Sequence, residues 1–286
     1  MASKSQLWAP KQARDYIYVP EAADNKYTHG VLGVVAGSKK YPGAAILAIK
    51  ACAASGVGMI RFVGTPALNA LVLNTTPSVV VSNGRVDAWL LGPGIEGRMD
   101  IDPSTLVRQR AMQVAYEDSV PTVLDAGGLA ILEKKRKPIL ITPHAGELSQ
   151  MLAGYDVKAS AHQISTKPAK WAQIAHDTLG VTVLLKGSRT FVADSNALVE
   201  LPLATPWLAT AGTGDVLSGI LGALVATHAK DLIEHPTQMV YIAATGALIH
   251  ALAAQRASAG GPTSAERIIE QISATVADLV AIESAL

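Results

Sequence analysis

Cysteine and charge are both scarce in this chain of 286 residues. The only cysteine, Cys52, excludes an intrachain disulfide, and its apolar neighbours favour a small buried side chain in a reducing compartment. With 24 Lys and Arg against 23 Asp and Glu, the net charge is +1, which excludes the basic footprint of a nucleic-acid-binding protein. The chain is 49% hydrophobic and only 16% charged, a balance that predicts a large core.

Targeting segments and membrane-length apolar runs are missing as well. Residues 1–10 lack the apolar stretch of a secretory signal. The two most apolar helix candidates, 216–226 and 239–254, are both shorter than the about 20 residues that cross a bilayer. No linker, charge block or internal repeat divides the sequence. We therefore expect residues 1–286 to form a single soluble, cytoplasmic domain with neither membrane nor nucleic acid as a partner.

Apolar runs of strand length alternate with helical patterns along most of the chain. Strands are predicted at 30–38, 58–64, 86–91, 121–125, 138–142 and 181–186, with a hairpin at 191–194 and 197–201. Helices are predicted at 10–16, 42–55, 103–116 and 167–179, and only helices follow the hairpin, including 263–286. Strand–helix–strand order implies parallel pairing. The sequence therefore predicts a three-layer α/β fold with a central, mostly parallel sheet.

A glycine-rich turn before a long apolar helix is the most informative segment. Gly212 and Gly214 can take up positive φ and leave room for a ligand at the backbone. The first turn of the following helix has free N–H groups at its positive end, which favours a phosphate. Asp215 then has two interpretations, because a carboxylate there either accepts a proton from an attacking hydroxyl or caps the helix.

Polar and glycine-rich residues also follow most predicted strands, where ligands bind in open parallel sheets. His144 is expected to bind a polar substrate or to contact its own helix start, and Glu147 suits a helix N-terminus. Lys186-Gly187, with Thr190 on the hairpin, is placed to hold phosphates or a ribose. Ordinary turns are the alternative for each segment, and the residues alone favour a solvated strand end for Arg189.

Two familiar nucleotide-binding motifs are absent or weak. The residues 92–97 fit G-x-G-x-x-G, but the next helix is expected only at 102–103, whereas a dinucleotide fingerprint needs a helix that opens at the glycines. No G-x-x-x-x-G-K-[ST] loop occurs in the chain. The pattern thus disfavours a dehydrogenase and excludes a P-loop protein.

Taken together, these segments resemble the ADP/ATP-dependent NAD(P)H-hydrate dehydratases, a family with the ribokinase-like fold. The shared motifs occur in the family's order over roughly 31–224: Tyr41-Pro42-Gly43-Ala44, Gly92-Pro93-Gly94, Val123-Leu124-Asp125-Ala126, Thr142-Pro143-His144-Ala145-Gly146-Glu147, Lys186-Gly187-Ser188-Arg189-Thr190 and Leu208-Ala209-Thr210-Ala211-Gly212-Thr213-Gly214-Asp215-Val216-Leu217-Ser218-Gly219. The resemblance implies a lyase of metabolite repair that phosphorylates the 6-hydroxyl of S-hydrated NADH or NADPH and then eliminates phosphate. The phosphoryl donor is ADP or ATP, and we favour ADP.

The resemblance also implies roles for individual residues. Asp215 is expected to be catalytic. Substrate contacts are expected from Ala44, Gly94, His144 and Asp215, and nucleotide contacts from Lys186, Gly187, Ser188, Arg189, Thr190, Gly212, Thr213 and Gly214. No residue is expected to serve as a dedicated metal ligand, because Mg²⁺ would be held mostly by phosphate oxygens and water.

The chain departs from the family pattern in two turns. Glu96 in the turn after Gly94 is bulkier and more charged than the residue usual in the family, and Gly127 replaces a frequent acid, so no role is assigned to it. Relatives form tetramers, and some carry an epimerase domain for which this chain has no room, so we expect a homo-oligomer and a separate epimerase. The alternatives are a vitamin-precursor kinase of the same fold, disfavoured by residues 142–147, and a nucleotide sensor without turnover, disfavoured by Asp215.

Overall fold

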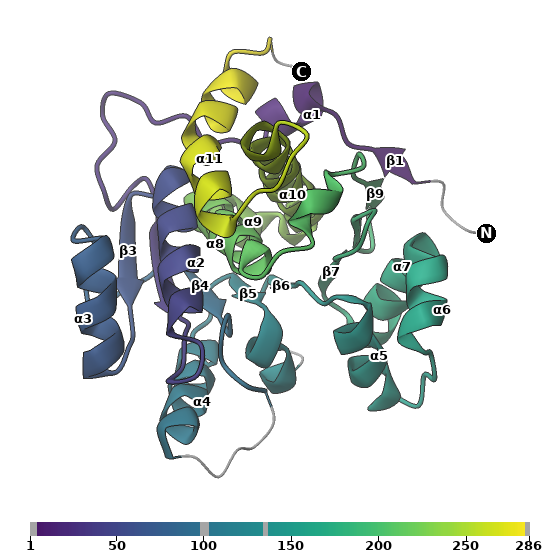
Figure 1. Cartoon of the computed structure of the whole chain (residues 1–286), viewed down its shortest axis with the longest axis horizontal. Coiled ribbons are helices and arrows are strands. Elements are labelled where there is room, and N and C mark those ends of the chain that lie inside the picture. The colour runs from purple at the N-terminus through teal and green to yellow at the C-terminus, as the bar shows by residue number, and fades with distance from the viewer. Residues whose placement is uncertain (1–4, 98–102, 134–136, 284–286) are drawn as a thin grey trace.

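The computed structural model describes residues 5–97, 103–133 and 137–283 (Figure 1). Within these residues, one nine-stranded sheet has the order β1-β9-β8-β7-β6-β5-β4-β2-β3. Neighbouring strands pair in parallel, except that β8 is antiparallel to β7 and β9. The predicted mostly parallel sheet and the predicted hairpin of two short strands are therefore confirmed. The strands are β1 (Gln6–Leu7), β2 (Val31–Val35), β3 (Met59–Phe62), β4 (Ala88–Leu91), β5 (Thr122–Leu124), β6 (Ile139–Ile141), β7 (Thr182–Leu185), β8 (Phe191–Ala193) and β9 (Leu198–Glu200).

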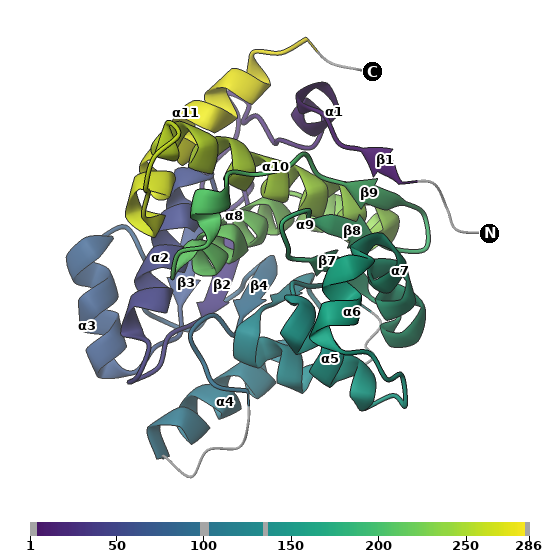
Figure 2. The same cartoon turned by 45° about the vertical axis from the view of Figure 1, so that its right-hand side comes forward.

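Helices cover both faces of this sheet (Figures 1 and 2). One face carries α1 (Pro10–Arg14), α2 (Pro42–Ala54), α8 (Thr213–Thr227), α10 (Met239–Ser258) and α11 (Ala265–Val280), with α3 (Pro66–Thr75) beside α2. The other face carries α4 (Pro103–Tyr116), the 3-10 helix η1 (Ala126–Ile131), α5 (Ala145–Ala153), α6 (Ala161–Thr166) and α7 (Pro168–Leu179). The short helices α9 (Ala229–Glu234), η2 (Pro206–Leu208) and η3 (Pro236–Gln238) lie in the connections.

Alternate strand residues supply two separate cores. In β4, Leu90 packs with the α2–α8–α10 face, whereas Trp89 and Leu91 pack with the α4–α7 face. Strands covered on both faces are apolar at nearly every position, which is why their sequences read as continuous hydrophobic runs.

Several helices and strands differ from the prediction in their presence or in their bounds. The helix α3, which begins at the Thr65 cap, was not predicted, and neither was the pairing of β1 with β9. The last helix is shorter than predicted and ends at Val280, and residues 284–286 lie outside the described part, as does residue 102 before α4.

The helix α10 is longer than predicted. The segment Pro236–Ser258 has the length and composition of a membrane-crossing helix, so the expectation that both apolar helices are too short was wrong. However, 72% of its most apolar window is buried inside the molecule, where α10 packs against α8, α11 and the sheet. An apolar helix buried on this scale serves as a core element.

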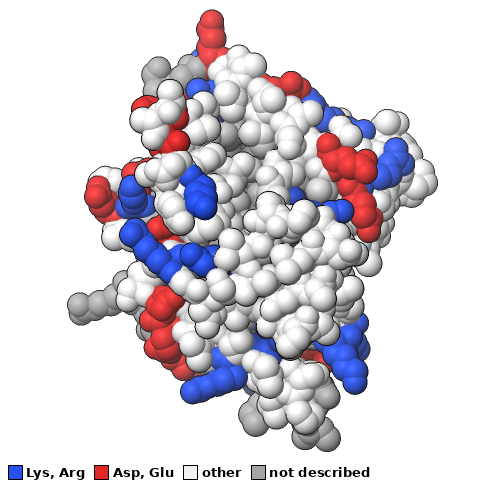
Figure 3. All heavy atoms as spheres, turned by 90° about the vertical axis from the view of Figure 1, so that its left-hand side faces the viewer, with Lys and Arg blue, Asp and Glu red and all other residues white. Residues whose placement is uncertain are grey.

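Charged side chains are mixed on the face shown in Figure 3. Small groups of Lys and Arg lie beside small groups of Asp and Glu around a broad uncharged centre. This face therefore has no patch of one sign, in keeping with a net charge of +1.

Candidate active site

The start of α8 has the geometry of an anion-binding turn. Gly212 is the N-cap with φ +88°, and the helix begins at Thr213. No side chain caps this helix end, so its first N–H groups stay free for a ligand. Thr213 fixes the turn, because its hydroxyl donates to the carbonyls of Leu208 and Thr210 at 3.0 Å each.

The two glycines of this turn have different roles. At Gly212, a Cβ would lie 2.6 Å from Leu47 Cδ1, and the positive φ disfavours any side chain. Gly214 lies inside the helix without a positive φ, and a Cβ there would meet nothing within 4 Å. The expectation of positive φ is therefore confirmed for Gly212 and wrong for Gly214. The absence of a side chain at Gly214 instead leaves open space beside the turn.

Asp215 is the third residue of α8 and does not cap it, so the capping interpretation is wrong. Burial, and after it the negative charge of Asp125, raise the pKa of Asp215 to about 6, against a smaller lowering by Lys186. A carboxylate with a pKa near the working pH, in a helix start that favours anions, has the properties of a general base.

Behind Asp215 lies a buried polar network that the sequence did not reveal. The Asp125 carboxylate accepts from Lys186 Nζ and Thr142 Oγ1 at 2.8 Å each and from Ser218 Oγ at 2.6 Å. Burial raises the pKa of Asp125, but Lys186 and the two hydroxyls outweigh it and hold that pKa below the ordinary value. Asp125 is thus an anion at neutral pH, close enough to perturb Asp215.

The parallel sheet explains how this network forms. Asp125, Thr142 and Lys186 each follow one of three adjacent strands, β5, β6 and β7, so their side chains meet at one edge. Burial lowers the pKa of Lys186, yet Asp125 and then Glu147 raise it above the ordinary value. Lys186 therefore stays a cation, with Nζ 3.8 Å from Glu147 Oε2.

His144 has the local role that was considered for it. Its Nδ1 accepts from the N–H groups of Gly146 and Glu147 at 3.0 and 3.2 Å, and Glu147 Oε2 accepts from the His144 N–H at 2.8 Å. This reciprocal cap begins α5 and holds the ring at the surface, where 60% of the side chain is exposed. Its other ring nitrogen, Nε2, lies 3.6 Å from Glu147 Oε2.

A cavity of about 290 Å³ brings most of the predicted nucleotide-binding residues together. Of these residues, Lys186, Gly187, Ser188, Thr190, Thr213 and Gly214 line it. His144 also lines this cavity, together with apolar residues of the hairpin and of α10. Gly212 is not in the lining, and it shapes the turn from behind.

Two further observations refine this cavity. Arg189 is not in its lining, because its guanidinium pairs with Glu200 and borders a smaller neighbouring hollow. His250 of α10 does line the cavity and was not predicted. Burial lowers the pKa of His250 to about 4, so the ring is neutral at physiological pH.

The predicted substrate contacts Ala44 and Gly94 are neighbours. Gly94 has φ +67°, and a Cβ on it would lie 2.3 Å from Ala44 Cβ, so the turn packs directly on the start of α2. A backbone bond from Gly37 N to Pro93 O at 2.7 Å fixes this arrangement. The unusual Glu96 pairs with Lys40 at 2.7 Å, which neutralises its charge.

Close packing of α2 against α8 joins this turn to the anion site. A Cβ on Gly219 would lie 2.2 Å from the Ala48 carbonyl oxygen, so the two helix backbones touch one turn beyond Ala44 and Asp215. Of the four predicted substrate residues, Ala44 and Gly94 adjoin each other and Asp215 lies on the helix that packs against α2. Only His144 is in the lining of the 290 Å³ cavity.

Comparison with known proteins gives a consistent result. A family model described as NAD(P)H-hydrate dehydratase matches residues 32–273. The bifunctional NAD(P)H-hydrate repair enzyme of Mycobacterium tuberculosis is 40% identical over 222 residues, which cover 73% of this chain and 43% of that protein. The corresponding enzyme of Mycobacterium leprae is 35% identical over 281 residues, 92% of this chain and 54% of that protein. The chain thus spans about half the length of these curated relatives.

Solved structures share the fold. An ADP/ATP-dependent NAD(P)H-hydrate dehydratase from Bacillus subtilis, co-crystallised with ATP and Mg²⁺, superposes with a TM-score of 0.81 at 23% identity, covering 97% of this chain and all of that one. A ribokinase-like superfamily protein from Enterococcus faecalis superposes with a TM-score of 0.80 at 19% identity, covering 96% of each chain. The predicted three-layer ribokinase-like fold is confirmed.

Proposed function

Because the chain belongs to the NAD(P)H-hydrate dehydratase family, we propose that it restores hydrated NADH or NADPH by nucleotide-dependent dehydration of the S epimer. A Bacillus subtilis relative named ADP-dependent (S)-NAD(P)H-hydrate dehydratase, 27% identical over 78% of this chain, supports this reaction and ADP as the donor. The cavity at Lys186–Thr190 and the start of α8 is the proposed nucleotide site.

The single observation that carries the proposal is the position of Asp215. Its carboxylate has a pKa of about 6 and stands in the first turn of the helix whose free N–H groups attract phosphate. In the first step, Asp215 takes the proton of the substrate 6-hydroxyl as that oxygen bonds to the terminal phosphorus of the nucleotide. The bond to the bridging oxygen breaks, and the departing nucleotide keeps its electron pair.

In the second step, the phosphate group of the new ester leaves the ring as inorganic phosphate. The C6–O bond breaks with its electrons on phosphate, and transfer of a C5 proton to water restores the ring double bond. With ADP as the donor, the products are NADH or NADPH, AMP and inorganic phosphate. Lys186 and the N–H groups of α8 stabilise the charge of the phosphoryl group during transfer.

Mg²⁺ fits this site only as a companion of the phosphates. Among the described residues, no group of three or more His, Cys, Asp or Glu side chains is placed to hold a metal ion. Both Asp125 oxygens are already bonded, so this buried carboxylate has no oxygen to spare for a metal ion. Mg²⁺ binds in this way, through one or two carboxylates, phosphate oxygens and water, and it would neutralise phosphate charge.

The remaining expectations are part of the same proposal. The bifunctional names of the Mycobacterium relatives support an epimerase that interconverts the two hydrate epimers as the partner activity. A single domain over 1–286, a homotetramer and a cytoplasmic location stay predictions.

A near-ultraviolet absorbance assay tests the reaction, because the reduced nicotinamide ring absorbs there and its hydrate does not. The protein, Mg²⁺ and hydrated NADH are mixed with ADP in one cuvette and with ATP in another. We expect the NADH band to return with ADP, together with AMP and phosphate. A stable phosphorylated product of another small molecule, with no return of the band, would instead identify a kinase.

A further inference from the structure

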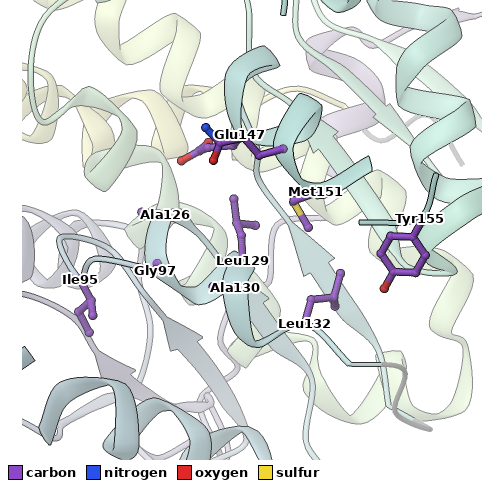
Figure 4. Close-up of a pocket in the computed structure, with 11 residues that line it drawn as sticks. Ile95, Gly97, Ala126, Leu129, Ala130, Leu132, Glu147, Met151 and Tyr155 are labelled. Atoms are coloured by element: carbon purple, nitrogen blue, oxygen red, sulfur yellow. The ribbon is translucent and has the colours of Figure 1, made fainter. Parts of the chain in front are cut away.

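A second cavity, of about 530 Å³, lies between η1 and α5 and has no place in the mechanism above (Figure 4). Leu129 and Met151 point toward its centre from opposite walls, and Tyr155 lies at its far end (Figure 4). Its volume falls in the range of roughly 300–1,000 Å³ that small-molecule sites occupy. Its lining is mostly apolar, with Glu147 and Gln150 as its charged and amide side chains.

Residues that line this η1–α5 hollow are direct neighbours of the predicted substrate contacts. Ile95 follows Gly94 directly, and Glu147 forms the reciprocal cap with His144. Ala126, at the third wall, follows Asp125 of the buried network. All three walls therefore continue from residues of the active site.

The walls of the hollow are held rigidly. A Cβ on Gly127 would lie 2.2 Å from the Ile95 carbonyl oxygen, so the two turns pack backbone to backbone. Ala126 has φ +46°, a conformation that residues with a side chain rarely adopt. This bend turns the chain from β5 into η1, which directs Asp125 inward while Leu129 enters the hollow.

The hollow and the nucleotide cavity share no described lining residue. They lie on either side of the contact between Glu147 and Lys186, whose charged atoms are 3.8 Å apart. A phosphoryl transfer between two nucleotide-sized molecules needs such an arrangement, with a separate cavity for each molecule and a shared point of transfer between them.

We infer that the η1–α5 hollow is the subsite for the adenosine half of the hydrated dinucleotide, the half that does not react. This inference rests on the proposed function. Leu129, Leu132 and Met151 offer apolar walls between which a flat ring can bind, and the half-exposed Tyr155 offers a ring at the rim for stacking. The Gln150 amide matches the hydrogen-bonding edge of adenine.

Remote binding of this kind would raise catalytic efficiency by holding the reacting ring at Asp215. The experiment compares hydrated NADH with hydrated reduced nicotinamide mononucleotide, which lacks the adenosine half, at saturating ADP. In the wild-type protein we expect the truncated substrate to have a kcat/KM lower by about tenfold or more.

The variant Met151→Trp fills the hollow, and Leu71→Trp makes the same change in bulk on the exposed face of α3 as the matched control. Met151→Trp should lower kcat/KM for hydrated NADH by about tenfold and leave the truncated substrate unchanged, whereas Leu71→Trp should change neither. Tyr155→Ala, at an exposed position, should likewise lower kcat/KM for hydrated NADH and leave that for the truncated substrate unchanged. Equal losses on both substrates, or no loss on either, would overturn the inference.

Binding of NADH itself, followed by its fluorescence, separates this inference from the proposed function. If no hydrate is turned over but Met151→Trp still weakens NADH binding, the reaction is wrong and the subsite is correct. If the hydrate is turned over but Met151→Trp and Tyr155→Ala change neither NADH binding nor kcat/KM, the proposed reaction is correct and the hollow is not the adenosine subsite. Binding of free AMP that does not compete with NADH would identify a regulatory site and overturn the inference.

Discussion

The substitution Asp125→Asn should move the pH dependence of the reaction toward acid. In the wild-type protein, Asp125 is an anion that contributes to the raised pKa of Asp215. The amide side chain of the variant has nearly the same shape and keeps an oxygen as an acceptor for the network, but it has no charge. The pKa of Asp215 must therefore fall, because a like charge is removed and the Lys186 cation is no longer neutralised by a carboxylate beside it.

The size of the effect follows from the same interactions. The pKa of Asp215 rises from 3.8 to about 6, with burial as the larger cause and Asp125 as the second. We expect Asp125→Asn to lower this pKa by about one unit, within the range that a neighbouring charge produces. At pH 5 the ionised fraction of Asp215 would increase from about one tenth to about one half, so activity relative to the plateau would increase about fivefold.

The assay is the profile of kcat/KM between pH 5 and 8 for both proteins. The terminal phosphate of the nucleotide also titrates near pH 6. Because this titration is common to both proteins, the difference between the two pH profiles reports the change in Asp215. Loss of the Asp125 charge should lower the free energy of unfolding by roughly 3 kcal/mol, because Lys186 loses its main partner.

That loss of stability cannot imitate the pH shift. The folded-state pKa of Asp125 is lowered, so its stabilising contribution is present above its unfolded pKa and is lost only as the pH falls through the folded value. It is therefore constant across the assay range. An acid limb that stays in place or moves to higher pH would refute the reasoning. Carbon-13 NMR of Asp-labelled protein would then show whether Asp215 titrates near pH 6 at all.

Four further substitutions test the site and the packing that supports it. Asp215→Asn should lower kcat by at least about 100-fold while ADP still binds, as calorimetry would show; near-normal kcat would contradict the role as general base. Gly214→Val should weaken ADP binding without a large fall in Tm, since only open space is filled, whereas Gly212→Val should lower Tm because Leu47 and the positive φ oppose it. Arg108→Met should reduce the free energy of unfolding in urea by about 2–4 kcal/mol, because the buried guanidinium donates to three strand-end carbonyls; an unchanged midpoint would show that water replaces it.

Local patterns were enough to predict most of the fold. The strands from β2 to β9 and the helices α2, α4 and α7 lie within a few residues of their predicted positions, because strands covered on both faces are apolar throughout and end in Gly, Pro or Asp. The turn at Gly212 and the cap at His144 could be predicted as well, since each depends mainly on residues within five positions along the chain. By contrast, β1 is only two residues long and is defined by its pairing with β9, so no local sequence pattern predicts it.

The charge balance of the site depends on contacts between distant residues. Lys186 was expected to face the nucleotide, yet its Nζ binds Asp125, 61 positions earlier, and Ser218 reaches the same carboxylate from 93 positions away. Sequence motifs place each residue at a strand end or helix start, but strand order and helix packing set which of them meet, and burial sets their pKa values. The chain's motifs thus indicate the family, while the tertiary structure determines the raised pKa of Asp215, because that pKa depends on burial and on the charge of Asp125, which only folding brings near.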